Sequence, residues 1–592
     1  MAAIRPIRQA EEMTGSRDAS PAPASGARDL RAALTDLRDV SAKVRFPLHL
    51  PGAEAARRAA RGMVGQLDDY LLPRLDRLDA PLLVVVGGST GAGKSTLVNS
   101  LVAQPVSATG VLRPTTRAPV LVCHPEDASW FSATRLLPRL MRTRDPFGDA
   151  GTLRVVESSR LSPGLALLDA PDIDSVVESN RALAEQLLAA ADLWLFVTTA
   201  ARYADAVPWD FLRTARVRGT AIALVLDRVP AGAGETVGTH LAEMLRRHDL
   251  GEAPLFIVEE LPTTSDGLLP AAAVAEISDW LRSLADSAAA RAAVVRQTVD
   301  GAVAALDATV VELAEAAADQ VQAAEALTGT VTNAYQAAQT TVEQGMRDGT
   351  LLRGEVLARW QELVGTGEFM RGLQARIGRL RDRVFAAVTG RPGPVDRLQG
   401  ALESGLVTLI RGAAGDAAEQ AAGAWRGHPA GAALMTPAPW LARGSDDLSE
   451  RTERRVRDWQ REVLDLVRAE AGNKAFVARA GAYAVNAIGL VVIIAVFTAT
   501  AFIPTGAEIV VAGGTTIAAQ KVLEAIFGDQ AVRELAVKAR RRLLQIVDEL
   551  LDEEAQRFRA VLAEQDIDPA APALLRAAAE RVRRARAAGA LR

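Results

Sequence analysis

The stretch PLLVVVGGSTGAGKSTLV, residues 81–98, constrains the fold of this chain more than any other. Five consecutive apolar residues, Leu82 to Val86, lead into Gly88-Ser-Thr-Gly-Ala-Gly-Lys-Ser95, which matches the pattern G-x-x-x-x-G-K-[ST]. The apolar run before the glycines and the helix-compatible TLVNSLV after them are the strand and helix that this motif requires. The sequence therefore predicts a phosphate-binding loop inside an α/β domain.

Each residue of this loop has an expected role. Gly88, Gly91 and Gly93 let the backbone turn and aim its N–H groups at phosphate oxygens, and the following helix adds positive potential. Lys94 is expected to reach the β- and γ-phosphates, and the Ser95 hydroxyl to bind Mg²⁺. A chance glycine-rich turn is the alternative, and the correct flanks disfavour it. Further nucleotide contacts are expected from Ser89, Thr90, Ala92 and Thr96.

Composition limits the partners and the compartment. With 592 residues the chain is too long for one core, so two to four domains are expected. A formal net charge of −4 gives no global preference for nucleic acid, and no such partner is expected. The single cysteine, Cys123, fits a reducing cytoplasm and a buried strand. Residues 1–27 lack the apolar core of a secretion signal and are predicted to be a disordered tail.

The next two ranges differ in their apolar pattern. Residues 28–79 are predicted to form helices broken at Pro47 and Pro51, which either cap the nucleotide domain or pack on later helices. Residues 80–285 alternate apolar runs with helical patterns, which is typical of a mostly parallel α/β sheet. The expected strands are 82–86, 120–124, 165–168, 193–198, 221–226 and 255–258.

Two loops are predicted to complete the site. In the loop 110–119, Thr116 is favoured over Thr115 as the residue that offers its hydroxyl to Mg²⁺ and its backbone to the γ-phosphate, although an ordinary Pro/Thr turn is the alternative. Asp169 ends an apolar strand, as a Walker B acid does, so it is expected to hold Mg²⁺ directly or through water. A solvated carboxylate at the strand end is the alternative. The predicted catalytic residues are Lys94, Thr116 and Asp169, and the predicted metal ligands are Ser95, Thr116 and Asp169.

The end of the strand at 221–226 lies where guanine-selective proteins place Asn/Thr-Lys-x-Asp. This chain has Asp227-Arg228-Val-Pro230 instead. Our hypothesis is that Asp227 reads the N1–H and N2–H edge of guanine and that the aliphatic stem of Arg228 covers the ring.

Together these motifs resemble the dynamin-related branch of the P-loop GTPases, specifically bacterial dynamin-like proteins of the actinobacterial type. The resemblance covers residues 80–260 by motif and the helical remainder by organisation, and RPTTRAPV at 113–120 is its most particular part. It implies binding of GTP with Mg²⁺, with ATP not excluded, GTP hydrolysis, and dimerisation of the nucleotide domain with the same or a related chain.

The sequence departs from the family pattern at positions that affect turnover. Where D-x-x-G is usual, Asp172 replaces the glycine, and Ile173 stands where a water-orienting Gln is common. Slow intrinsic hydrolysis is therefore expected unless a partner molecule completes the site.

After Pro270 the strand signals stop. Apolar residues spaced by three and four from Val299 to Leu327 predict a long helix with a heptad-like seam, and residues 286–479 are predicted to be a helical bundle or stalk. Further helices are expected at 352–388, 394–424 and 446–480, and a loop or hinge at 427–444.

Residues 480–520 carry a single charge, Glu508, between basic flanks. As a helix, residues 480–503 would extend about 36 Å, enough to span a bilayer core. The second arm, 509–519, is short, and basic flanks on both sides place both ends on the cytoplasmic face. A membrane hairpin or paddle that contacts anionic lipids is therefore predicted at the cell membrane, with 521–592 returning as a C-terminal helix.

These observations favour a dynamin-like GTPase that couples nucleotide state through a helical stalk to membrane association or remodelling. Two alternatives stay open. One is a membrane-anchored, NTP-dependent switch or scaffold with little turnover. The other is a soluble P-loop ATPase in which residues 480–520 form buried core.

Overall fold

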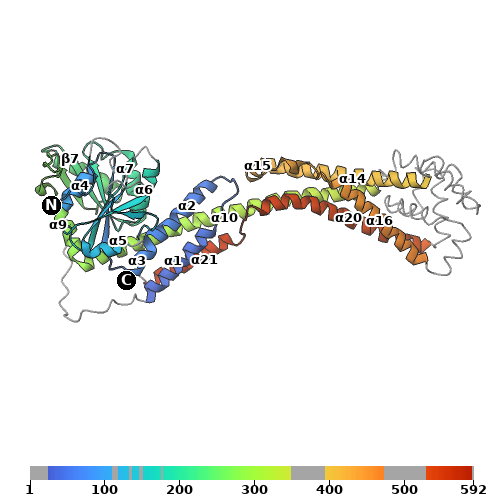
Figure 1. The fold of residues 1–592 in the computed structure, drawn as a ribbon, viewed down its shortest axis with the longest axis horizontal. Helices are drawn as coiled ribbons and strands as arrows, with labels where there is room; N and C mark the ends of the chain where they lie inside the picture. The colour runs from blue at the N-terminus through green and yellow to red at the C-terminus, as the bar shows by residue number, and fades with distance from the viewer. Residues whose placement is uncertain are drawn as a thin grey trace, which may run out of the picture. The chain divides into compact units, whose positions relative to one another are not determined.

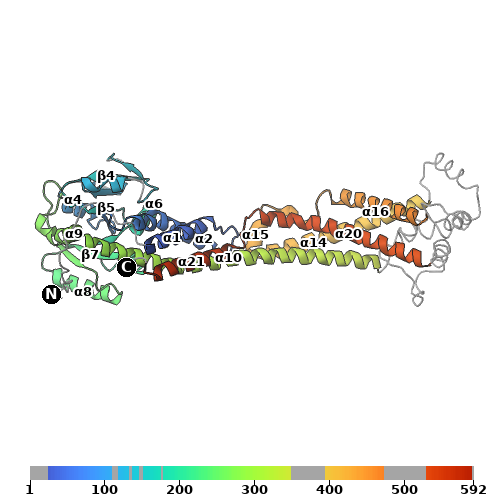
Figure 2. The same cartoon turned by 90° about the horizontal axis from the view of Figure 1, so that it is seen from below.

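The computed structural model describes residues 25–109, 118–132, 136–145, 151–174, 178–347, 394–471 and 529–589. The chain divides into two units, each assembled from separated stretches (Figures 1 and 2). The first, here called the sheet unit, comprises residues 1–46, 54–318 and 568–592. The second, the helical unit, comprises residues 47–53 and 319–567.

The sheet unit contains an eight-stranded sheet in the order β3-β4-β2-β5-β1-β6-β7-β8. Its pairs are parallel except for β2 with β5, so the predicted mostly parallel α/β sheet is confirmed. Every strand expected from the sequence is present, whereas the short strands β3 and β4 were missed. The strands are β1 Leu82–Gly88, β2 Val120–Cys123, β3 Met141–Thr143, β4 Thr152–Glu157, β5 Leu165–Asp169, β6 Leu193–Thr199, β7 Ala221–Val229 and β8 Leu255–Glu259.

The centre of the sheet is covered on both faces, because every residue of β1, β5 and β6 is buried. Strand β1 lies between β5 and β6, and its register places Val86 opposite Asp169. The carboxyl ends of these strands therefore meet where the phosphate-binding loop begins. The connecting helices are α4 Lys94–Val102, α5 Ala128–Ser132, α6 Glu178–Ala189, α7 Ala206–Val217, α8 Gly234–Arg247 and α9 Ala275–Asp286.

The N-terminal helices belong to the sheet unit together with the last helix of the chain. Helix α1 packs along α21, and the two lie side by side in both views (Figures 1 and 2). Arg581 of α21 pairs with Asp36 of α1, and the Nε of Arg586 lies 2.8 Å from Asp300 Oδ1. Of the two arrangements that the sequence left open, packing on later helices is therefore observed. These elements are α1 Ser25–Lys43, α2 Ala53–Gln66, the π-helix η1 Leu67–Leu71, α3 Leu72–Asp76 and α21 Ala571–Ala587.

The helical unit is built on long helices with an aromatic core. Trp425, Trp459 and Phe558 are fully buried, and the ring of Trp425 packs edge-on against Phe558. Each indole also has a hydrogen-bond acceptor, since Trp425 Nε1 donates to Leu327 O at 3.1 Å and Trp459 Nε1 to Ala539 O at 2.9 Å. The elements are α10 Ala288–Arg347, which begins in the sheet unit, α14 Pro394–Arg426, α15 Pro429–Met435, the 3₁₀ helix η5 Pro439–Ala442, α16 Leu448–Ala471 and α20 Asp529–Ala563.

The structure changes one sequence prediction for this half of the chain, and two others lie outside the described residues. Residues 427–444, expected as a loop or hinge, contain the helix α15 and the 3₁₀ helix η5, because Pro429 and Pro439 each lie in a first turn, where proline is tolerated. Within the described residues, no helix combines the length and apolar character needed to cross a bilayer. The predicted hairpin at 480–520 and the predicted helix at 352–388 lie outside the described residues.

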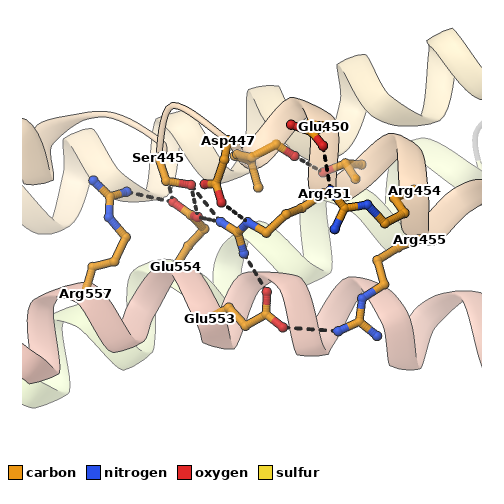
Figure 3. Close-up of polar contacts among 11 residues, drawn as sticks. Ser445, Asp447, Glu450, Arg451, Arg454, Arg455, Glu553, Glu554 and Arg557 are labelled. Atoms are coloured by element: carbon orange, nitrogen blue, oxygen red, sulfur yellow. Dashed lines mark hydrogen bonds and ion pairs between the residues drawn. The ribbon is translucent and has the colours of Figure 1, made fainter.

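A buried carboxylate holds the start of α16 against α20 (Figure 3). Glu554 has no exposed side-chain surface, and its oxygens accept hydrogen bonds from Ser445 N at 2.9 Å, Ser445 Oγ at 2.5 Å and Arg557 Nη1 at 2.7 Å. Arg451 also pairs with it. Burial alone would raise the pKa of Glu554, but the hydrogen bonds from Ser445 and Arg557 outweigh it and lower the pKa. The side chain is therefore a structural anion.

We predict that Glu554→Ala lowers the free energy of unfolding of the helical unit by about 1–3 kcal/mol, because it takes a buried carboxylate away from the partly buried Arg451 and Arg557. The matched control is Glu553→Ala, since Glu553 also pairs with Arg451 but is 42% exposed; its expected cost is below about 1 kcal/mol. Urea unfolding measures both, and equal costs would contradict the prediction.

The lowered pKa of Glu554 makes the stability that its carboxylate contributes to the folded protein depend on pH. This contribution is complete above the ordinary Glu value of 4.5 and is lost as the pH falls through the lower pKa of the folded protein. The difference between wild type and Glu554→Gln in urea should therefore shrink in acid.

Candidate nucleotide-binding site

The phosphate-binding loop, residues 88–95, runs from the last residue of β1 into the first turn of α4. At two of its glycines a Cβ would overlap a neighbouring group, and the group differs between the two. Gly88 has φ +153°, and a Cβ there would overlap the carbonyl oxygen of Val197 in the neighbouring strand β6. Gly93 has φ +91°, and a Cβ there would overlap the carboxylate of Asp227. The strand, the loop and the helix predicted from the motif are therefore all present, and the loop lies directly against the ends of β6 and β7.

Lys94 is bent back over this loop. Its side chain is 6% exposed, and Nζ donates to Gly88 O and Ser89 O, each at 3.1 Å, and pairs with Asp172. An ammonium group has three donors, so all three are used. The lysine is thus held at the loop, with a carboxylate as its one anionic contact.

Asp169 is brought to the Ser95 hydroxyl, as predicted for a shared metal. It is fully buried at the end of β5, and its Oδ2 accepts from Ser95 Oγ and Ser107 Oγ, each at 2.6 Å. Its Oδ1 is buried without a hydrogen-bond partner among the described residues. Burial raises the pKa of Asp169, while the hydrogen bonds from Ser107 and Ser95 and the charge of Lys94 oppose that shift.

These groups fit Mg²⁺, which prefers hard oxygen ligands. The Ser95 hydroxyl and the orphaned Asp169 Oδ1 are such donors, whereas the described residues contain no cluster of three or more His, Cys, Asp or Glu side chains able to hold a metal. The third predicted ligand, Thr116, lies outside the described residues. Ser107, which binds Asp169, was not anticipated from the sequence.

The predicted base-recognition residues lie at the end of β7. Asp227 is buried beside Gly93, and burial raises its pKa. Its Oδ1 accepts from Arg228 N at 2.8 Å, and Arg228 itself is exposed with φ +54°. Asp227 therefore lies close to the phosphate loop. Thr96, another predicted nucleotide contact, lies in the first turn of α4 and is partly exposed.

The loop after Asp169 covers the phosphate loop. Asp174 Oδ1 accepts from both the backbone N and the Oγ1 of Thr90, each at 2.6 Å. Ile173, which lies between Asp172 and Asp174 in the chain, is fully buried, and its N–H donates to Gly88 O at 3.4 Å. An isoleucine packed in this way cannot orient a water.

Arg202, in the loop after β6, was not among the residues that the sequence predicted for this site. Arg202 Nη1 donates to Thr90 O at 3.0 Å, and its Nη2 donates to Asp174 Oδ2 at 2.8 Å. A basic residue just after the strand beside β1 was the available signal.

No protein-family model and no curated protein matches the chain. Among solved structures, it is similar to Aquifex aeolicus Era bound to GDP·AlF4⁻, at 18% identity over 34% of this chain and a TM-score of 0.23. It is equally similar to Era in complex with MgGDPNP and part of 16S ribosomal RNA, at 18% identity over 34% of this chain and a TM-score of 0.24. The chain spans 56% of the length of these Era structures.

A third similar structure is that of an oligomerised bacterial dynamin pair, described as a mechanism for the long-range sensing and tethering of membranes. The similarity covers 95% of each chain, at 10% identity and a TM-score of 0.42. Bacterial dynamins are the family that the sequence motifs resemble. All three TM-scores are below 0.5.

The contact between Gly93 and Asp227 predicts a specific defect. Gly93→Ala should cost about 1–2 kcal/mol for a Cβ at positive φ and about 1–3 kcal/mol more for the overlap with Asp227. Gly232→Ala is the matched control, because Gly232 has φ +77° with nothing within 4 Å of a new Cβ. The unfolding midpoints of both variants in urea measure the difference, and equal shifts would mean that Asp227 does not lie beside Gly93.

Proposed function

We propose that this chain is a dynamin-like GTPase that binds GTP with Mg²⁺ at residues 88–96, hydrolyses it slowly and couples the nucleotide state to membrane association. The observation that carries the nucleotide part is the meeting of Lys94, Ser95 and Asp169, with one Asp169 oxygen buried and unpartnered. A hydrated Mg²⁺ would give that oxygen a partner.

The residues divide the work of the site in a simple way. Lys94 exchanges Asp172 for phosphate oxygens, and the N-terminus of α4 adds a favourable dipole. Ser95 and Asp169 hold the metal, with Thr116 as the proposed third ligand. Mg²⁺, when bound there, would neutralise part of the charge of the phosphates.

Hydrolysis is expected to need help. Ile173 is buried and apolar, so the chain lacks a water-orienting side chain at that position. We propose that a second nucleotide domain, from the same or a related chain, completes the site and accelerates turnover.

Guanine preference is proposed through Asp227, with Arg228 over the base. A carboxylate buried beside the phosphate loop, with its pKa raised, gains by accepting hydrogen bonds from a base edge. Guanine offers two such donors, N1–H and N2–H, on that edge.

Competition binding tests this assignment. GTP should displace a fluorescent GDP analogue from the full-length chain, and ATP should displace it at least tenfold less well. Lys94→Ala should weaken binding about 10- to 150-fold, the equivalent of losing a charge-assisted hydrogen bond. Lys43→Ala, at an exposed lysine of α1, is the control. Equal displacement by ATP and GTP would support the NTP-dependent alternatives.

Membrane association is proposed from the sequence of residues 480–520, which carry one charge between basic flanks. The full chain should float with vesicles that contain anionic lipid, and a 480–520 deletion should remain at the bottom of the gradient. Equal flotation of both would favour the soluble ATPase alternative. Electron microscopy of the vesicles with and without GTP then separates remodelling from a scaffold that binds without changing their shape.

A further inference from the structure

Arg202 contacts the phosphate loop, and the proposed function gives this residue no role. It lies between β6 and α7, and its guanidinium is held on several sides. Nη1 donates to Thr90 O at 3.0 Å, Nη2 to Asp174 Oδ2 at 2.8 Å and Nε to Asp205 Oδ2 at 2.9 Å. A planar, preorganised cation therefore lies against the third residue of the loop that is to bind phosphates.

Asp174 and Asp172 accept hydrogen bonds from three donor groups of this loop. Asp174 takes both the N–H and the hydroxyl of Thr90, and Asp172 takes the ammonium of Lys94. Burial alone would raise the pKa of Asp174, but the hydrogen bonds from Thr90 and Arg202 outweigh it and lower the pKa, so the group stays ionised. Carboxylates thus stand where phosphate oxygens are to bind.

The charges around the loop show what nucleotide binding must change. Two cations, Lys94 and Arg202, contact three carboxylates, those of Asp172, Asp174 and Asp205. A triphosphate adds negative charge, and it needs Lys94, so it must displace Asp172. Asp174 lies two residues further along the same loop and accepts from the Thr90 N–H that a phosphate oxygen would need, so we expect it to leave Thr90 and Arg202 as well.

Once Asp174 leaves, Arg202 remains anchored by Asp205 and by Thr90 O. One edge of its guanidinium is then free next to the loop that follows Asp169. In switch proteins that loop is ordered by the γ-phosphate. A diphosphate lacks this group, so the loop is expected to move less when a diphosphate binds.

We propose that Arg202 recognises the terminal phosphate of a nucleoside triphosphate, and that Asp174 occupies the Arg202 guanidinium whenever that phosphate is absent. This inference rests on the proposed nucleotide binding and adds to it the discrimination between triphosphate and diphosphate.

The test compares the affinities of GDPNP and GDP for full-length variants by fluorescence titration. Arg202→Ala should weaken GDPNP binding about 10- to 150-fold, as for a lost charge-assisted hydrogen bond, and change GDP binding less than threefold. Arg202→Lys, which keeps the charge but loses the fork, should recover part of the GDPNP affinity. Arg213→Ala on α7 is the control, because Arg213 is exposed and pairs only with Asp210 among the described residues.

The variant Asp174→Asn gives a second test whose expected result cannot be produced by misfolding. It frees Arg202 without removing it, so GDPNP should bind more tightly than to wild type, and misfolding cannot produce such a gain. Equal losses of GDPNP and GDP affinity in Arg202→Ala, or weaker GDPNP binding in Asp174→Asn, would overturn the role of Arg202 while leaving nucleotide binding intact. Failure of wild type to bind either nucleotide would overturn the proposed function as well.

Discussion

The sheet unit depends on one buried carboxylate, Asp192, at the residue before β6. Its side chain has no exposed surface and accepts hydrogen bonds from Leu83 N at 2.7 Å and Tyr70 Oη at 3.0 Å. It also pairs with Arg74, which is equally buried. Since a buried charge is costly unless it is fully paired, these partners cannot separate without a large loss of stability. The N-terminal helical elements η1 and α3 are thereby fixed to the strand that leads into the phosphate loop.

The same point in the chain also fixes the start of α10. The backbone oxygen of Asp192 accepts from Thr298 Oγ1 at 2.8 Å, and that hydroxyl lies 3.2 Å from Ala221 N at the start of β7. The position of β1 between β5 and β6 therefore follows from contacts at the end of the sheet away from the loop. A site that must hold phosphate oxygens to within fractions of an ångström benefits from such a rigid base.

The parts of the site that the sequence predicted are those set by local pattern and strand order. The glycine pattern and the apolar run before it predicted the loop, and a parallel sheet brings the end of β5, with Asp169, to Ser95. Arg202 and Asp174 could not be predicted, because their meeting depends on how two irregular loops lie over Thr90. Strands β3 and β4 were missed because most of their residues are exposed or only partly buried, so neither forms a run of buried apolar residues, and β3 has only three residues. The pairing of α1 with α21 joins residues at opposite ends of the sequence, and no periodicity identifies such a partner.

The chain contains two kinds of buried ionic contact, and they differ in what can replace them. In the helical unit Glu554 is surrounded by Arg451, Arg557 and Ser445, all supplied by the protein and all required for packing. Around Lys94 the carboxylate is that of Asp172, from the loop after β5, and the proposed phosphate ligand would take its place. The first arrangement is part of the packing of the helical unit, whereas the second lies where a ligand is proposed to bind.

The division of the sheet unit among distant stretches has a consequence for how the protein is made. Leu30, Leu34 and Leu37 of α1 are completely buried, and α1 packs along α21, which the ribosome adds only at residues 571–587. The face of α1 that packs on α21 therefore meets its partner late in synthesis. Domains usually fold as their own segment is completed. Here the contact between α1 and α21 can form only after the helical unit has been translated, because residues 319–567 lie between the two helices in the chain.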